Sequence, residues 1–285
     1  MPIPRTILFP VDFSDRCLQL WPAVAAMALT LRAPVTVLHA FDAGCPAADL
    51  SPVANAVATI REHLRRRLAG YPGVPTGTID IRREVVAGHA VESILHCAAQ
   101  MEEPLIMLAT RGQSHFRTLL LGSVTAGVLH DSPWPVWTDA HREVHAPHTG
   151  QYRTIVCATD MGQKTQDLLR AAKEFSVLFG AELHIVHSVP GVDPRFSSAL
   201  ARRAHAFLVQ EAREQFPAHC QAAGFDAHLE IVEDTGLAEG IAGAVSRHGG
   251  DLLIIGRGAI QGLLGRLRSN AHALIRSSPC PVLSL

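Results

Sequence analysis

The sequence lacks an excess of charge of either sign and contains few aromatic residues. Its 285 residues carry a formal net charge of −1, and aromatic residues make up 5% of the chain. Nucleic-acid-binding surfaces are basic, so this composition argues against a nucleic-acid partner. Hydrophobic residues reach 48% against 18% charged residues, and most of them are small and aliphatic, which favours layered α/β packing over a β-sandwich.

Long apolar segments and paired cysteines are also missing. The N-terminus, MPIPRTILFPVDFSD, reaches an aspartate after a short apolar run, so we expect neither a signal peptide nor a membrane partner. No two of the six cysteines form a CxxC motif, and we predict that they are reduced and buried, as in a cytoplasmic protein. These cysteines are Cys17, Cys45, Cys97, Cys157, Cys220 and Cys280.

An internal repeat organises the chain. RTILFPVDFS returns as RTIVCATDMG, and VTVLHAFD returns as LHIVHSVP, both 148 residues later. Near the C-terminus DSPWPVW returns as SSPCPVL after only 146 residues, so the second copy has lost two residues. We therefore expect one domain at residues 1–140 and a second at 152–285, joined by a polar linker at 141–151.

Each copy alternates apolar strands with amphipathic helices. Strands joined by helices imply a parallel sheet covered on both faces, so each copy is predicted to be a three-layer α/β/α domain. In the first copy the expected strands are 6–11, 35–40, 78–86, 105–109 and 135–138. The expected helices are 14–31, 51–68, 90–100 and one that starts at residue 123. Pro22 is expected to kink the first helix or to shift its start.

The second expected helix has a clear start and an apolar stripe. Ser51 fits the N-cap and Pro52 the first helical position. The arginines between residues 61 and 67 fall mostly off the stripe, so we expect them to face solvent. The stripe consists of Val53, Val57, Ile60, Leu64 and Leu68.

The loop ATRGQSHFRTLLLGS, residues 109–123, follows the fourth expected strand. In an open parallel sheet, ligands bind beyond the carboxyl ends of the strands. Gly112 admits a ligand close to the backbone, and Gly122-Ser123 opens a helix whose free N–H groups attract an anion. Positive charge nearby comes from Arg111, His115 and Arg117. The alternative is that the glycines serve only the turn and that Ser123 is only a helix cap.

With these motifs the sequence resembles the universal stress protein family in its tandem two-domain form, over nearly the whole chain. The ATP-binding branch of that family carries G-x2-G-x9-G-[ST] after the fourth strand. Here Ala109-Thr110-Arg111-Gly112, nine further residues and Gly122-Ser123 fit that spacing, with alanine in place of the first glycine. The family also carries V-D-x-S after the first strand, which is Val11-Asp12-Phe13-Ser14 here.

The resemblance implies a fold and a ligand. Each copy should be a Rossmann-like domain with a five-stranded, mainly parallel sheet of strand order 3-2-1-4-5. The two copies should pack as a pseudo-two-fold pair through the edge strands at 135–138 and 281–285. ATP, or ADP or AMP, with or without magnesium, should bind in the N-terminal domain. The residues implied for this site are Pro10, Val11, Asp12, Ala40, Ala109, Arg111, Gly112, Gly122, Ser123 and Val124.

The matching loop of the second copy is degenerate. Asp160 is retained, but Gly256 and Gly258 are separated by one residue instead of two. Counting on from Gly258, the position of the glycine before the serine is held by Arg268, followed by Ser269. Arg268 either fills the site and leaves a structural domain, or binds an anion of another ligand. We favour the first alternative.

Other chemistry finds little support in the sequence. His141, His145 and His148 have H-x3-H-x2-H spacing, but a polar linker offers no preset metal geometry. His39 and His187 end the second strand of each copy and are expected to form local hydrogen bonds. No motif of a hydrolase, metalloprotease or P-loop enzyme is present.

Three functions stay open from the sequence. The first is a cytoplasmic stress-response or regulatory protein that binds an adenine nucleotide, with a further homodimer and an unidentified protein partner in prospect. The second is a nucleotide-free interaction scaffold of the same fold. The third is a slow ATPase, for which the chain shows no water-positioning base. We expect no enzyme activity beyond slow ATP hydrolysis.

Overall fold

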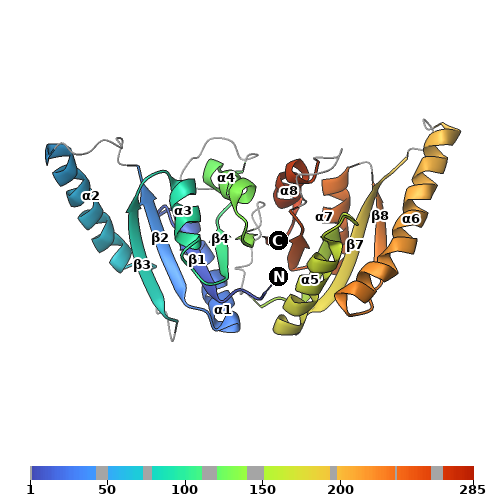
Figure 1. The fold of residues 1–285 in the computed structure, drawn as a ribbon, viewed down its shortest axis with the longest axis horizontal. Helices are drawn as coiled ribbons and strands as arrows, with labels where there is room; N and C mark the ends of the chain where they lie inside the picture. The colour runs from blue at the N-terminus through green and yellow to red at the C-terminus, as the bar shows by residue number, and fades with distance from the viewer. Residues whose placement is uncertain are drawn as a thin grey trace. The chain divides into compact units, whose positions relative to one another are not determined.

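The computed structural model describes residues 2–42, 51–72, 79–110, 121–139, 151–192, 198–234, 236–257 and 266–285. The chain divides into two compact units, one made mainly of Pro4–Trp137 and the other mainly of Gln151–Leu285. Each unit is a layered α/β structure (Figure 1). No helix in the part of the chain that is described is long and apolar enough to cross a membrane.

The first unit contains a sheet with strand order β3-β2-β1-β4-β5. The pairs β1–β2, β1–β4 and β2–β3 are parallel. Helices α3 and α4 contact each other, and α2 contacts β3. The elements in chain order are β1 (Thr6–Pro10), α1 (Asp15–Leu31), β2 (Val35–Phe41), α2 (Ser51–Ala69), β3 (Ile81–Ala87), α3 (Ala90–Ala98), β4 (Pro104–Leu108), α4 (Ser123–Asp131) and β5 (Val136–Thr138).

The second unit repeats this order as β8-β7-β6-β9-β10, with parallel pairing of β6 to β7 and β9, of β7 to β8 and of β9 to β10. The predicted strand order 3-2-1-4-5 is thus confirmed in both copies. The elements are β6 (Thr154–Thr159), α5 (Thr165–Phe179), β7 (Glu182–Pro190), α6 (Ala199–Ala223), β8 (Leu229–Asp234), α7 (Leu237–His248), β9 (Leu252–Ile255), α8 (Arg266–Ser277) and β10 (Val282–Ser284).

The strand register shows where the two copies differ in length. Ile7 of β1 and Ile155 of β6 are 148 residues apart, but their partners Leu105 and Leu252 are only 147 apart. Before β9, the second copy is therefore one residue shorter than the first. The second lost residue falls after β9, where the sequence separates Gly256 and Gly258 by one residue instead of two.

Local sequence explains the elements around the first strand. Ile7, Leu8 and Phe9 of β1 are fully buried, as expected of a strand covered on both faces. The predicted N-cap Ser14 is confirmed, since its hydroxyl accepts a hydrogen bond from the N–H of Cys17. Pro22 does not shift the start of α1, which begins at Asp15 and continues through the proline.

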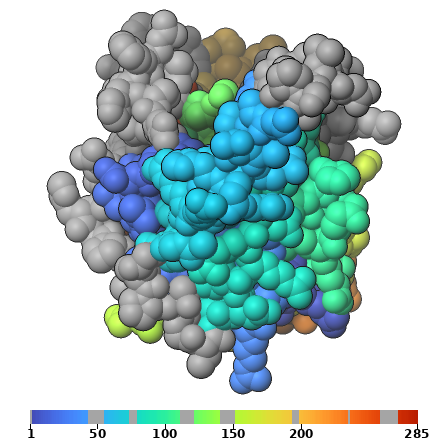
Figure 2. Space-filling model, turned by 90° about the vertical axis from the view of Figure 1, so that its left-hand side faces the viewer, coloured from blue at the N-terminus to red at the C-terminus, as the bar shows by residue number. Residues whose placement is uncertain are grey.

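The predicted apolar stripe of α2 is wrong at one of the four positions whose burial the structure describes, and the burial of Val53 lies outside that description. Leu68 is buried and Val57 and Leu64 are half-buried, but Ile60 is 48% exposed. Arg61, expected in solvent, is half-buried instead, because positions 57, 61, 64 and 68 form the face toward β3. Figure 2 shows α2 and β3 side by side on the outer surface of the first unit, in sky blue to teal.

Candidate functional site

The candidate site lies where the strand order of the first unit reverses. Strands β2 and β3 follow on one side of β1, whereas β4 and β5 follow on the other. Because β1 and β4 are parallel neighbours, Asp12 after β1 and Ala109-Thr110 after β4 lie at the same edge of the sheet. Ligands of open α/β sheets bind at this switch point. The structure thus brings the two sequence-predicted halves of the site together.

The carboxylate of Asp12 is held by the first turn of α1. Its Oδ1 accepts hydrogen bonds from the N–H of Ser14 at 2.9 Å and from the thiol of Cys17 at 3.2 Å. Burial and the negative charge of Asp12 together raise the pKa of Cys17 to about 12, so this thiol stays protonated and acts as a donor. The half-buried Asp12 therefore has a defined orientation before any ligand arrives.

An aromatic cluster that the sequence analysis missed lies beside Asp12. Phe13 has a positive φ of 61°, and its ring centroid is 4.4 Å from that of His39 and 5.9 Å from that of Tyr71. The guanidinium of Arg67 lies 4.2 Å from the centre of the Phe13 ring, a cation–π contact. The only sequence signal for this cluster was the position of Phe13 after Asp12, because Arg67 and Tyr71 lie more than 50 residues away in the chain.

The two strand-end histidines behave alike. Nδ1 of His39 is 2.7 Å from the carbonyl oxygen of Val11, and Nδ1 of His187 is 2.8 Å from that of Thr159. Each histidine thus ties the end of the second strand to the end of the first strand in its unit. The prediction of a local hydrogen bond is confirmed.

Two hydrogen bonds hold the ends of the glycine-containing loop together. The N–H of Gly122 donates to the carbonyl of Thr110 at 2.9 Å, and the hydroxyl of Thr125 donates to the carbonyl of Ala109 at 2.8 Å. The start of α4 is therefore fixed against the end of β4. Residues 111–120 lie outside the described residues. They include four residues of the sequence prediction, Arg111, Gly112, His115 and Arg117.

The backbone at Ala109 is not strained by its side chain. Among the described non-glycine residues, a positive φ occurs at Phe13, Arg32, Glu103 and Met161, and Ala109 is not one of them. Ala109 is buried, with 9% exposure. The alanine that departs from the family motif therefore adopts a conformation open to any L-residue.

Gly122 leaves the N-terminus of α4 open. It is the N-cap, with φ −59° and ψ 143°, and supplies no side chain to the free N–H groups that follow. Ser123 and Val124 are the first two helical residues and are not fully buried, and the first turn contains no acidic residue. This helix end can accept an anion.

The second unit retains one half of the site. Oδ1 of Asp160 accepts a hydrogen bond from the N–H of Gly162 at 3.0 Å, and Met161 has a φ of 58°. This turn repeats the Asp12–Phe13–Ser14 turn of the first unit. A Cβ on Gly256 would meet its nearest described neighbour, a methyl of Leu168, at an ordinary 3.5 Å, so no described neighbour requires glycine there.

The other half of the second site differs from that of the first unit. By the glycine count, Arg268 and Ser269 correspond to Gly122 and Ser123, where α4 begins. In the structure α8 begins at Arg266, so both residues lie inside the helix. In the sequence, Gly265 directly precedes this helix start. Gly258 lies outside the described residues.

A cavity of about 570 Å³ opens elsewhere in the second unit, at the amino ends of β7 and β8. Two of its lining side chains, His184 and His248, stack with ring centroids 4.0 Å apart. Glu230 binds both His248 and Arg247. Burial raises the pKa of Glu230, but these two partners outweigh it and hold the pKa below its usual value. The cavity faces away from the carboxyl ends of the strands, where Asp160 lies.

No metal centre emerges from the described ranges, which contain no group of three His, Cys, Asp or Glu residues able to hold an ion. His141, His145 and His148 lie outside those ranges. The five described cysteines, Cys17, Cys97, Cys157, Cys220 and Cys280, are free thiols. All of them are buried except Cys97, which is half-buried, so the predicted burial is confirmed for four; Cys45 lies outside the described residues.

Comparison with known proteins gives the same match for both halves of the chain. The sequence model of the Universal stress protein family (Usp) matches residues 4–138 and again residues 151–285. A solved structure of a universal stress protein from Archaeoglobus fulgidus DSM 4304 is 22% identical, with a TM-score of 0.65 over 98% of this chain and 95% of that one. A protein of unknown function from Pseudomonas aeruginosa PAO1 is 18% identical, with a TM-score of 0.64 over 99% and 92%. No curated protein matches the chain.

Proposed function

The chain belongs to the universal stress protein family, and from this we propose that its N-terminal domain binds ATP, ADP or AMP as part of a cytoplasmic stress response. The domains proposed are 1–140 and 152–285, with a linker at 141–151. The backbone conformation of Ala109 is the observation that best supports this proposal. Its ordinary backbone conformation removes the main objection to a nucleotide loop that lacks its first glycine.

The proposed roles follow the positions of the residues. Asp12, already oriented by Ser14 and Cys17, would bind the adenosine part alongside Pro10 and Val11. The backbone of Ala40 would face the adenine. The phosphates would lie at the N-terminus of α4, where the absence of acidic residues in the first turn favours an anion. The residues proposed there are Ala109, Arg111, Gly112, Gly122, Ser123 and Val124.

The proposal is a binding function and assigns no catalytic residue. Oδ1 of Asp12 is committed to two hydrogen bonds that position it, which suits a ligand-binding carboxylate. Magnesium, when bound, would neutralise phosphate charge, since it usually binds through substrate phosphates and water. Hydrolysis, if it occurs, is expected to be slow. Bound nucleotide would stabilise the first domain by mass action and so alter its contacts with a partner protein.

The first experiment is mass spectrometry of small molecules released from freshly purified, denatured protein. ATP titration calorimetry with and without magnesium follows. We expect about one nucleotide per chain, because the second copy has a shortened glycine spacing and carries Arg268 at the position that Gly122 holds in the first. Gly122→Arg should abolish binding by placing a long side chain at the phosphate position. Asp12→Asn should weaken it, and the matched variant Asp160→Asn in the second unit should leave it unchanged.

Three results would contradict this proposal or limit it. If the titration shows no heat of binding up to about 1 mM ATP, the nucleotide-free scaffold is the better description of the protein. Binding that survives Gly122→Arg would place the ligand elsewhere. A rise to two nucleotides per chain in Arg268→Gly would mean that this arginine alone blocks a competent second site.

A further inference from the structure

The first half of α6 exposes apolar side chains on its outer face. Leu200 is 76% exposed, Phe207 65% and Leu208 44%. They are three of the nine large hydrophobic residues exposed in the described part of the chain, yet they lie within nine consecutive residues. Leu200 and Phe207 are seven residues apart, which places them on the same side of the helix. A surface stripe of this kind marks an interaction site.

The stripe is fixed relative to its own domain. In the second half of α6, Ala212, Phe216 and Cys220 are buried. The first half is held by His205, whose Nδ1 lies 3.0 Å from the carbonyl of Pro190 and whose Nε2 lies 2.7 Å from Oε2 of Glu233. The first half of α6 is therefore anchored to β7 and β8 and the second half is packed into the domain, so the apolar stripe cannot turn inward.

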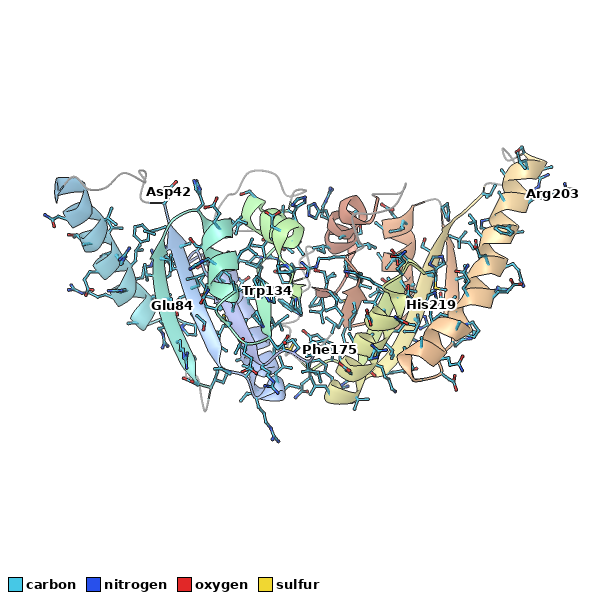
Figure 3. All side chains as sticks on the ribbon, in the orientation of Figure 1. Asp42, Glu84, Trp134, Phe175, Arg203 and His219 are labelled. Atoms are coloured by element: carbon cyan, nitrogen blue, oxygen red, sulfur yellow. The ribbon has the colours of Figure 1, made fainter. Side chains whose placement is uncertain are left out.

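Charges are placed symmetrically around Phe207. Arg203 lies four residues before it and Glu211 four residues after it, so all three share one side of the helix. Arg203 is exposed and points away from β8 (Figure 3). Glu211 accepts a hydrogen bond from Gln215 one turn later, which keeps its carboxylate on the helix surface. An antiparallel copy of the same helix, centred on Phe207, brings each arginine opposite a glutamate.

We propose that α6 is a homodimer interface, in which the helix pairs antiparallel with α6 of a second copy about a two-fold axis at Phe207. The occupant is a second copy because Arg203 and Glu211 lie four residues on either side of Phe207 and so complement each other across a two-fold axis there. The two Phe207 rings meet at the axis, and the Arg203–Glu211 pairs flank them on both sides. One pair of helices buries less than the roughly 1,200 Å² of a standard interface, so the dimer is expected to be weak, with a Kd in the micromolar range.

Sedimentation velocity of the full chain, over a concentration range of about 1 to 200 μM, tests this proposal. The wild-type chain should convert from monomer to dimer as the concentration rises. Phe207→Ser should weaken association at least about tenfold, because it removes the central aromatic contact. Val177→Ser is the matched control, since Val177 of α5 is 69% exposed but lies outside the stripe. It should leave the dimer unchanged.

A charge exchange tests the antiparallel register. Arg203→Glu alone and Glu211→Arg alone should each weaken the dimer, because each puts like charges together on both sides of the axis. The double variant should restore it, and circular dichroism checks that the helix content is unchanged. A chain that stays monomeric over the whole concentration range would overturn the proposal and would mean that the stripe binds a different protein. Dimerisation that is unaffected by Phe207→Ser, or a double variant that does not restore the dimer, would overturn it as well.

Discussion

Two residues at the candidate site differ in how unusual their backbone conformations are. Phe13 has a left-handed backbone, and its ring is packed between groups from β2 and from the end of α2. Ala109, in contrast, has ordinary backbone geometry, although the nucleotide-binding motif that the sequence resembles has glycine at this position. The two residues lie at the same edge of the sheet, so a turn with a left-handed residue after β1 and an unstrained one after β4 lie together at the candidate site.

Ala109→Gly tests the assignment of an unstrained backbone. Glycine has more conformations in the unfolded chain, so the variant should lower the free energy of unfolding by about 0.5–1 kcal/mol. Nucleotide affinity should change by less than about threefold, since no strain is released. Urea unfolding and titration calorimetry measure the two effects. A stability gain would mean that alanine is strained at this position.

Tyr71→Phe tests a buried hydroxyl. Tyr71 is 7% exposed, and its Oη is buried with no hydrogen-bond partner among the described residues. Removing an unsatisfied polar group while keeping the ring should leave the free energy of unfolding unchanged or raise it by up to about 1 kcal/mol. Urea unfolding at pH 7 measures it. A loss larger than about 1 kcal/mol would show that the hydroxyl forms a hydrogen bond in solution.

Among the secondary-structure elements, equivalent helices of the two units differ in how they begin. α4 starts directly after Gly122, whereas α8 starts before Arg268. The helix start matters because its free N–H groups can bind a phosphate. The spacing of glycines in the sequence predicted that the second site is degenerate, but it did not predict that α8 begins earlier, because helix boundaries depend on capping contacts as well as on composition.

The pairing of β8 with α7 should make the second unit sensitive to acid. Glu230 has a lowered pKa because Arg247 and His248 outweigh the effect of burial. Its contribution to stability is therefore present above the unfolded pKa near 4.5 and is lost as the pH falls through the lower folded pKa. Glu230→Gln should cost about 1 kcal/mol at pH 7 and less at pH 2–3, where the carboxylate is more protonated. Urea unfolding at the two pH values measures this; an equal cost at both would contradict it.

At the scale of the whole molecule, buried thiols should limit stability in alkali. Burial raises the pKa of Cys17, Cys157 and Cys280 to about 12 and that of Cys97 to about 11, from an ordinary value of 9.0. The unfolded chain releases these protons near pH 9, but the folded chain retains them. The stabilisation is thus complete below pH 9 and is lost as the pH rises toward 12.

Unfolding in urea between pH 7 and pH 11 measures this dependence. The midpoint should stay nearly constant up to about pH 9 and then fall steadily, by an amount that Cys157→Ala reduces. Cys157 suits this test because it is fully buried and burial is the cause of its raised pKa. A midpoint that does not change with pH would mean that these thiols ionise in the folded state.

The sequence by itself determined the features that depend on spacing along the chain. The repeat, the alternation of strands and helices, the N-cap at Ser14 and the positions of Asp12 and Asp160 after their strands all follow from local residue order. Tertiary structure alone decided the φ angle at Ala109, the contact of Phe13 with Arg67 and Tyr71, and the exchange of Ile60 and Arg61 on α2. These features depend on which distant side chains share a limited packing space, and that information is absent from any short stretch of the chain.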